Sequence, residues 1–107
     1  MKEILEQLGS KYLFKTFYAI DKSHIHTKKH LKIFAGVDLK DFYHLIFDVD
    51  QKSHFLLKHA QEIMALREEV ITYTQRQYKY QHLILHATLC SKARRYLENT
   101  QWKVLSL

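Results

Sequence analysis

The sequence predicts an α/β domain with a small mixed sheet, and three neighbouring segments carry most of that prediction. Residues 42–49 hold six apolar residues in eight, which is typical of a strand buried on both faces. A polar corner follows at residues 50–53. Beyond it, apolar residues recur at helical spacing as far as residue 71. Residues 82–89 are again almost continuously apolar and indicate a second buried strand, so a helix connects two strands.

The remaining elements follow from local signals. Gly9 is placed to end an amphipathic helix, and Ser53 and Ser91 are good N-caps for the two later helices. Residues 11–20 favour a strand by composition, although Leu13, Phe17 and Ile20 would also form one helical stripe. The expected elements are a helix at 2–8, strands at 11–20, 30–35 and 42–49, a turn at 36–41, a helix from 53, a connector at 72–80, a strand at 82–89, a helix at 92–99 and a strand at 102–105.

This order, α-β-β-β-α-β-α-β, predicts one small sheet with right-handed crossovers between its parallel strands. An all-α bundle is the alternative, because the chain has no proline to interrupt a helix. A chain of 107 residues is long enough for one core, so we expect a single domain over 1–107. The chain has neither the long apolar core of a signal peptide nor a span of about 20 apolar residues, which predicts no membrane insertion. Cys90 has no partner for a disulfide, and we expect a cytoplasmic protein.

The formal net charge of +6, with eight histidines in addition, suits a polyanionic partner. Tyrosines near the basic residues, notably Tyr73, Tyr78 and Tyr80, have the chemistry to stack on bases. A dispersed, solvated surface is the alternative interpretation. The candidate nucleic-acid-binding residues are Lys28, Lys29, Lys32, Arg76, Lys79, Lys92, Arg94 and Arg95.

Acidic and basic residues meet at the polar corner that ends the central strand. Asp48, Asp50 and Lys52 fall on one face if the strand's alternation continues through them. Open α/β sheets tend to bind ligands at the carboxyl ends of their strands. The corner is therefore the first candidate site.

The triplet Asp50-Gln51-Lys52, together with the order of elements, resembles the PD-(D/E)xK nuclease core. The resemblance implies that acids such as Asp50 and Asp48 hold Mg²⁺ or another divalent metal. It also implies that Lys52 orients or activates the water that attacks a phosphodiester bond. Clustered carboxylates suit this chemistry because Mg²⁺ prefers oxygen ligands, and lysine suits developing negative charge.

The family carries a second acid on the preceding strand, and Val37-Asp38 matches its "PD" by spacing, without the proline. However, a hairpin that paired Asp38 with Asp50 would have to turn near His44, inside the predicted strand. Asp21 or Asp48 would have to take that role. Neither residue matches the family's pattern.

Histidines offer a second possible metal site. His24 and His26, with His30 nearby, have side chains that suit zinc, copper or nickel. In a hairpin centred on the turn at 36–41, the residues facing Asp48 and Asp50 would fall within 24–29. Packing or surface roles are the alternative for these histidines, as they are for His82 and His86 on the later strand.

Two further patterns limit the chemistry. Cys90 precedes a helix start, but no neighbouring base identifies it as a nucleophile, which favours a structural cysteine. Glycine-rich phosphate loops are absent, which predicts no nucleotide cofactor. The sequence therefore favours a basic domain that contacts nucleic acid, with a possible metal-dependent nuclease site. The alternative is a non-enzymatic domain that binds a protein partner or forms a homodimer.

Overall fold

The computed structural model describes residues 14–20 and 31–106. Within these ranges the order of elements is β-β-β-α-β-α-β, which confirms the predicted α/β fold and rules out the all-α alternative. The helix expected at 2–8 lies outside the described residues. The elements are β1 (Phe14–Ile20), β2 (Leu31–Asp38), β3 (Tyr43–Asp50), α2 (Leu57–Thr74), β4 (Tyr80–His86), α3 (Ser91–Asn99) and β5 (Trp102–Ser106).

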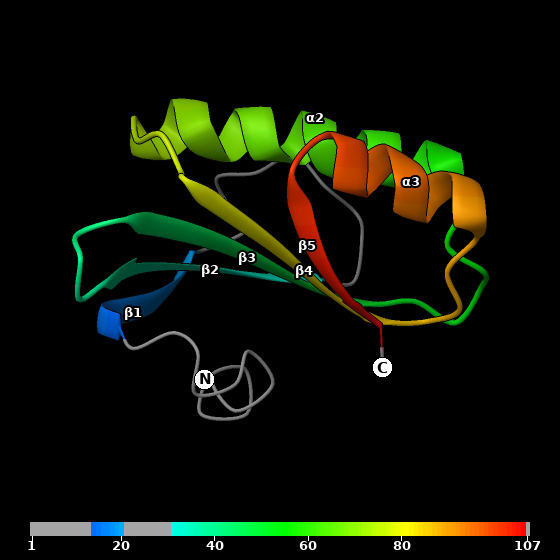
Figure 1. The fold of residues 1–107 in the computed structure, drawn as a ribbon, viewed down its shortest axis with the longest axis horizontal. Helices are drawn as coiled ribbons and strands as arrows, with labels where there is room; N and C mark the ends of the chain where they lie inside the picture. The colour runs from blue at the N-terminus through cyan, green and yellow to red at the C-terminus, as the bar shows by residue number, and fades with distance from the viewer. Residues whose placement is uncertain (1–13, 21–30, 107) are drawn as a thin grey trace.

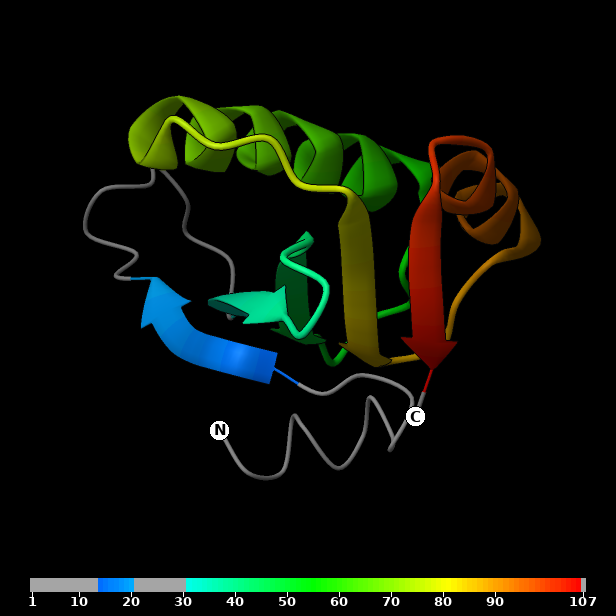
Figure 2. The same ribbon diagram turned by 60° about the vertical axis from the view of Figure 1, so that its left-hand side comes forward.

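The five strands form one mixed sheet in the order β1-β2-β3-β4-β5. The pairs β1–β2 and β2–β3 are antiparallel, whereas β3–β4 and β4–β5 are parallel. Each parallel connection contains a helix, and Figure 1 shows α2 and α3 lying together on one side of the sheet. The rotated view in Figure 2 shows β4 and β5 running side by side in the same direction.

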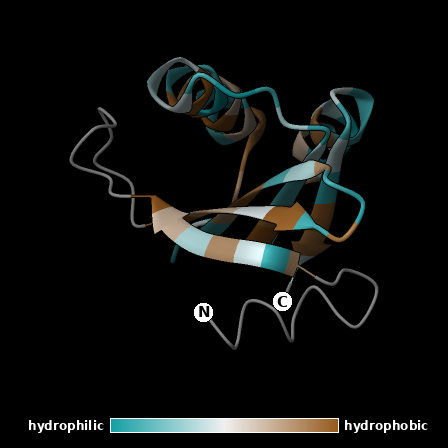
Figure 3. Ribbon diagram, turned by 90° about the vertical axis from the view of Figure 1, so that its left-hand side faces the viewer, coloured by the Kyte–Doolittle hydropathy of each residue, from teal (hydrophilic) through white to brown (hydrophobic). Residues whose placement is uncertain are grey.

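The main core lies between the sheet and the two helices, and Figure 3 shows these two layers end-on. On β3, Leu45, Phe47 and Val49 belong to this core and are almost completely buried. The α2 residues that pack in the same cluster are Ala60, Ile63, Leu66 and Val70. The helical spacing that predicted α2 and the apolar run that predicted β3 therefore contain the residues of the two surfaces that meet.

We call the face of the sheet that points away from α2 and α3 the far face. The alternate β3 side chains, His44, Ile46, Asp48 and Asp50, lie on it, because successive strand side chains point to opposite faces. Ile46 is fully buried there and packs in a second cluster with Phe34 and Ile84. The far face of β3 is therefore apolar in the middle and polar at both ends.

The helix starts differ from the sequence interpretation. Ser53 does not cap α2, whose N-cap is Leu56, with the Leu56 N–H donating to His59 Nδ1 at 2.9 Å. Gln51 explains the delay, because its Nε2 donates to the carbonyls of Ser53 and His54 at 3.2 and 3.1 Å and holds a turn there. At α3 the N-cap is Cys90 rather than Ser91.

The connection between α2 and β4 is also shorter than expected. Helix α2 continues to Thr74 and ends where Gln75 adopts the left-handed conformation, with φ of 54°. Strand β4 begins at Tyr80, within the segment expected to be a connector, and ends at His86 rather than residue 89. Among the described residues, no helix is long and apolar enough to span a membrane.

Phe47 lies in the centre of the sheet and is 0% exposed, so we expect Phe47→Ala to lower the free energy of unfolding by about 3–5 kcal/mol. Leu39→Ala is the control, because Leu39 is 58% exposed at the β2–β3 turn and should change stability by less than about 0.5 kcal/mol. Urea denaturation followed by circular dichroism measures both. Equal effects of the two substitutions would contradict this core assignment.

Candidate functional site

Two polar clusters occupy opposite ends of β3 on the far face. We call Asp48, Asp50 and His86 the carboxyl-end cluster, because they lie where β3 and β4 end. We call Asp38, His44 and His82 the hairpin-end cluster, because they lie beside the β2–β3 turn. The first contains the acids predicted from the sequence. The second contains side chains that the sequence interpretation did not bring together.

In the carboxyl-end cluster, Asp48 is held by a histidine from the neighbouring strand. His86 Nε2 lies 2.8 Å from Asp48 Oδ1, and the two side chains are 35% and 14% exposed. Asp50 is the register partner of His86 and is exposed. Since paired positions on neighbouring strands point to the same side, both carboxylates and the imidazole share the far face.

Lysine, rather than histidine, faces Asp48 from the antiparallel side. The register pairs Lys32 with Asp48, so the expectation that residues 24–29 face this acid is wrong. The reason is the position of the turn, which is centred on residues 39–42 instead of the 36–41 assumed from the sequence. Lys32 is exposed and places a cation on the far face next to the acids.

Lys52 does not extend the alternation of β3. The strand ends at Asp50, and Lys52 lies in a bend between the strand and α2, so strand geometry does not place it beside Asp50. The corner is nevertheless an ordered part of the carboxyl edge. Phe55 pairs with Leu89, its N–H donates to the Thr88 carbonyl at 2.8 Å, and His54 Nδ1 contacts Thr88 Oγ1. The segments that follow β3 and β4 therefore lie side by side.

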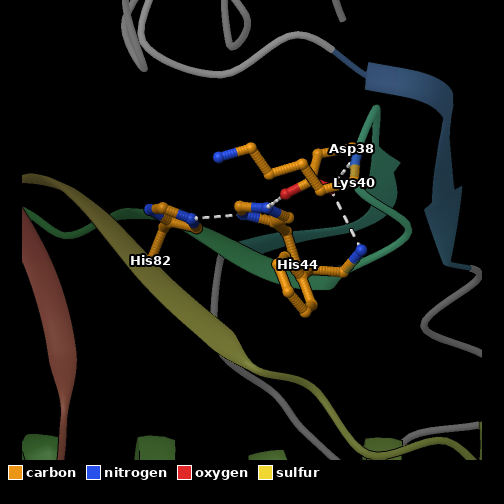
Figure 4. A network of polar contacts seen from close by, with 5 residues as sticks. Asp38, Lys40, His44 and His82 are labelled. Atoms are coloured by element: carbon orange, nitrogen blue, oxygen red, sulfur yellow. Dashed lines mark hydrogen bonds and ion pairs between the residues drawn. The ribbon is translucent and has the colours of Figure 1, made fainter.

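The hairpin-end cluster is a chain of three hydrogen-bonded side chains (Figure 4). Asp38 Oδ2 lies 2.9 Å from His44 Nε2, and His44 Nδ1 lies 2.9 Å from His82 Nε2. A carboxylate accepts, so His44 Nε2 carries a hydrogen and its Nδ1 accepts one from His82. Asp38 Oδ1 also accepts the N–H groups of Lys40 and Phe42, at 2.8 and 3.0 Å.

Burial and these contacts determine the charge of the hairpin-end cluster. The hydrogen bond from His44 holds the pKa of Asp38 below its usual value. Burial lowers the pKa of His44, against the opposing effect of Asp38. Burial, with the nearby His44 and Lys103, lowers the pKa of His82 to about 3. Both imidazoles are therefore neutral at pH 7, beside an ionised Asp38.

Asp38 and Asp50 lie at opposite ends of β3, which confirms the expectation that they cannot form one acidic site. Asp38 is instead engaged by His44 at the turn. The other proposed second acid, Asp21, lies outside the described residues. So do the candidate metal ligands His24 and His26 and the basic residues Lys28 and Lys29.

The described part of the chain contains no group of three or more histidine, cysteine, aspartate or glutamate side chains placed to hold a metal ion. Asp48 and Asp50 still provide carboxylate oxygens on one face. Mg²⁺ commonly binds through one or two carboxylates, and water and substrate phosphates complete its shell. The donor set at the carboxyl end therefore fits Mg²⁺ better than zinc, which prefers a closed set of nitrogen and sulfur ligands.

The basic residues predicted to bind nucleic acid are divided between different surfaces. Lys32 lies on the far face, whereas Lys92, Arg94 and Arg95 lie on α3, on the other side of the sheet (Figure 1). Arg76 and Lys79 lie between α2 and β4. Tyr78 is only 6% exposed, so it cannot stack on bases.

The sequence interpretation missed the role of His86. The signal was present, because strands β3 and β4 are joined by a helix and therefore run parallel, with their carboxyl ends at one edge. His86 and Asp50 both fall at such an end. The contact between His44 and His82 had no comparable signal, since it depends on the register between two strands 38 residues apart.

Protonation of His82 should destabilise the fold. The unfolded chain binds a proton near pH 6.5 but the folded chain only near pH 3, so the free energy of unfolding should fall as pH drops through this window. The expected slope is about 1.4 kcal/mol per pH unit for one proton. Denaturation at a series of pH values measures it. His82→Gln should lower this slope by about 1.4 kcal/mol per pH unit, the contribution of one proton. An unchanged slope would contradict the assignment of a neutral, buried His82.

No protein family matches the sequence, and no curated protein resembles it at a significant level. Solved structures do share its fold. A protein of unknown function, AF1548, superposes with a TM-score of 0.61 at 12% identity, over 97% of this chain and 54% of that one.

Two further solved structures also share the fold. A repair endonuclease from Pyrococcus abyssi gives a TM-score of 0.52 at 15% identity, over 87% of this chain and 39% of its own. EndoMS, solved with double-stranded DNA, gives 0.53 at 13% identity, over 99% and 42%. The chain thus spans about half the length of these structures or less. At such identities the likeness concerns the fold alone, and the fold shared with the repair endonuclease and with EndoMS agrees with the fold resemblance that the order of elements predicted.

Proposed function

We propose that this chain is a nucleic-acid-contacting domain that cleaves phosphodiester bonds with a divalent metal ion at the carboxyl-end cluster. One observation carries the proposal: Asp48 and Asp50 share the far face at the carboxyl end of a buried central strand, and His86 orients Asp48. The fold shared with two endonucleases supports it. A carboxylate pair at a strand end is also where open α/β sheets tend to bind ligands.

Each residue of the cluster has a distinct part in this proposal. Asp48 and Asp50 would hold the ion, preferably Mg²⁺, and a bound ion there would supply stabilisation of phosphate charge and activation of a water. His86 donates to Asp48 Oδ1, and this hydrogen bond would fix the orientation of the carboxylate. Lys32, the register partner of Asp48, would attract the anionic substrate. The family resemblance gives Lys52 the role of orienting the attacking water.

Double-stranded DNA is the first substrate to test, because the EndoMS structure contains it and the Pyrococcus abyssi protein is described as a repair endonuclease. The alternative function, a non-enzymatic protein-binding or homodimerising domain, also has an observation in its favour. Strands β1 and β5 form the two edges of the described sheet, and an edge strand can pair with another chain. Assays of cleavage and of oligomeric state distinguish these functions.

Removing a carboxylate from the proposed site should abolish cleavage without unfolding the protein. We expect Asp50→Asn and Asp48→Asn each to lower Mg²⁺-dependent cleavage of a DNA duplex at least about a hundredfold, because each removes a metal ligand. Asp41→Asn is the matched control, since Asp41 is an acid at the β2–β3 turn that pairs with Lys15. Cleavage is measured with Mg²⁺, with Mn²⁺ and with a chelator. A wild-type protein without metal-dependent cleavage of DNA or RNA would contradict the proposal.

His86 should act through Asp48 rather than on the substrate. We expect His86→Ala to raise the Mg²⁺ concentration for half-maximal cleavage by about 10- to 100-fold, because the Asp48 carboxylate loses its orienting donor. His86→Gln retains an N–H donor and should recover part of that loss. The measurement is a metal titration of the cleavage rate for the three proteins. An identical titration for His86→Ala and the wild type would show that His86 is not a positioning residue.

A further inference from the structure

The chain between β3 and its next contact with the sheet is held at both of its ends. At the first end, Asp50 is the last residue of β3 and pairs with β4. At the second end, the Phe55 N–H donates to the Thr88 carbonyl at 2.8 Å, and the Phe55 carbonyl accepts the Cys90 N–H at 3.1 Å. We call residues 51–54, which connect these two fixed points, the corner segment.

The side chain of Gln51 sets the path of the corner segment. Its Nε2 donates to the Ser53 carbonyl at 3.2 Å and to the His54 carbonyl at 3.1 Å. An amide nitrogen carries two hydrogens, and these two carbonyls match both of them. The contact of the same nitrogen with His59 Nδ1 is longer, at 3.5 Å, and that ring nitrogen already accepts the Leu56 N–H. Gln51 therefore folds the corner segment into a closed turn.

Lys52 lies inside this closed turn, and its side chain is exposed. Two residues of backbone span at most about 7 Å, so the backbone of Lys52 stays close to Asp50 although it does not continue the alternation of β3. The four-carbon stem of a lysine is flexible, so a fixed backbone is what limits the positions that the ammonium group can reach. Because the hydrogen bonds of Gln51 span Lys52 in the chain, they fix that backbone.

We propose that Gln51 is a positioning residue of the proposed nuclease site, and that it holds Lys52 where the ammonium group orients the attacking water. This inference rests on the proposed function and deepens it, because it gives a role to the residue between Asp50 and Lys52. An amide suits the position because it donates to two carbonyls without adding charge beside the carboxylates. A carboxylate there would face two carbonyl oxygens and could not bond them.

Gln51 and His86 should leave different kinetic signatures. His86 contacts a proposed metal ligand, so its loss should raise the Mg²⁺ concentration for half-maximal cleavage. Gln51 Nε2 instead bonds two backbone carbonyls of the corner segment. Its loss should therefore lower the maximal rate of cleavage and leave the half-maximal Mg²⁺ concentration unchanged. A misplacement of a reacting group by about 1 Å can lower a rate about a hundredfold.

A double-mutant cycle tests whether Gln51 acts through Lys52. The variants are Gln51→Met, Lys52→Ala and the combination of the two, and methionine keeps the length of the side chain while removing both donors. Gln51→Ala serves as a second variant without donors. Gln81→Met is the matched control, because Gln81 Nε2 donates to the Thr100 carbonyl at 3.4 Å near the other end of β4. Single-turnover cleavage of a DNA duplex is measured against Mg²⁺ concentration, and circular dichroism confirms that each variant folds.

We expect Gln51→Met to lower the maximal rate about 10- to 100-fold with the wild-type Mg²⁺ dependence, and Gln81→Met to keep the wild-type rate. In the Lys52→Ala background, Gln51→Met should cause no further loss, because the lysine that it positions is gone. An equal further loss in that background, or a wild-type rate for either single variant, would overturn the inference and leave the metal site standing. A wild-type protein without metal-dependent cleavage would overturn both.

Discussion

The burial of β3 on both faces is the constraint on which the structure depends. Leu45, Ile46 and Phe47 are all 0% exposed, although consecutive side chains point to opposite sides of the strand. The strand must therefore lie in the middle of the sheet, with β2 antiparallel on one side and β4 parallel on the other. This change of direction brings the carboxyl end of β3 beside the start of β2 and the end of β4. For that reason Asp48 lies opposite Lys32 on β2 and is hydrogen-bonded to His86 on β4.

The hairpin-end cluster shows how buried histidines are accommodated beside this strand. His44 is fully buried and His82 is 3% exposed, positions where an unpaired polar group would be costly. Their hydrogen bond, extended to Asp38, satisfies three ring nitrogens and links the β2–β3 turn to β4. Asp38 is thereby committed to a neighbouring imidazole. A carboxylate held in this way is poorly placed to serve as the second acid of a nuclease site.

The fold tolerates wide sequence variation, whereas the proposed site requires particular side chains. The sheet and its two crossover helices superpose on a repair endonuclease and on EndoMS, each more than twice this length, at 13–15% identity. The proposed chemistry depends on few side chains. Here the residue on β2 that faces Asp48 is a lysine, where the family resemblance leads one to expect an acid near the active site. The carboxyl-end cluster therefore depends on Asp48, Asp50 and His86 more than on a β2 acid.

Local sequence patterns determined most of the secondary structure. Continuous apolar runs indicated β3 and β4, because a strand buried on both faces is apolar throughout. Helical spacing indicated α2, because burial of one helix face imposes a helical period on its residues. The element boundaries shifted where side-chain hydrogen bonds stabilised a turn, as at Ser53 and His54, whose carbonyls accept from Gln51 Nε2. The α/β class and the two acids at a strand end were thus readable from the sequence.

Only the tertiary structure decided which side chains meet. The register of β2 against β3 places Lys32, rather than a residue of 24–29, opposite Asp48. That register depends on the position of the turn, which the sequence interpretation placed one to two residues too early. The register of β4 against β3 placed His86 beside Asp50 and His82 beside His44. The end of β3 at Asp50 separated Lys52 from the strand's alternation. Strand pairing couples residues far apart in the chain, and no local period encodes that coupling.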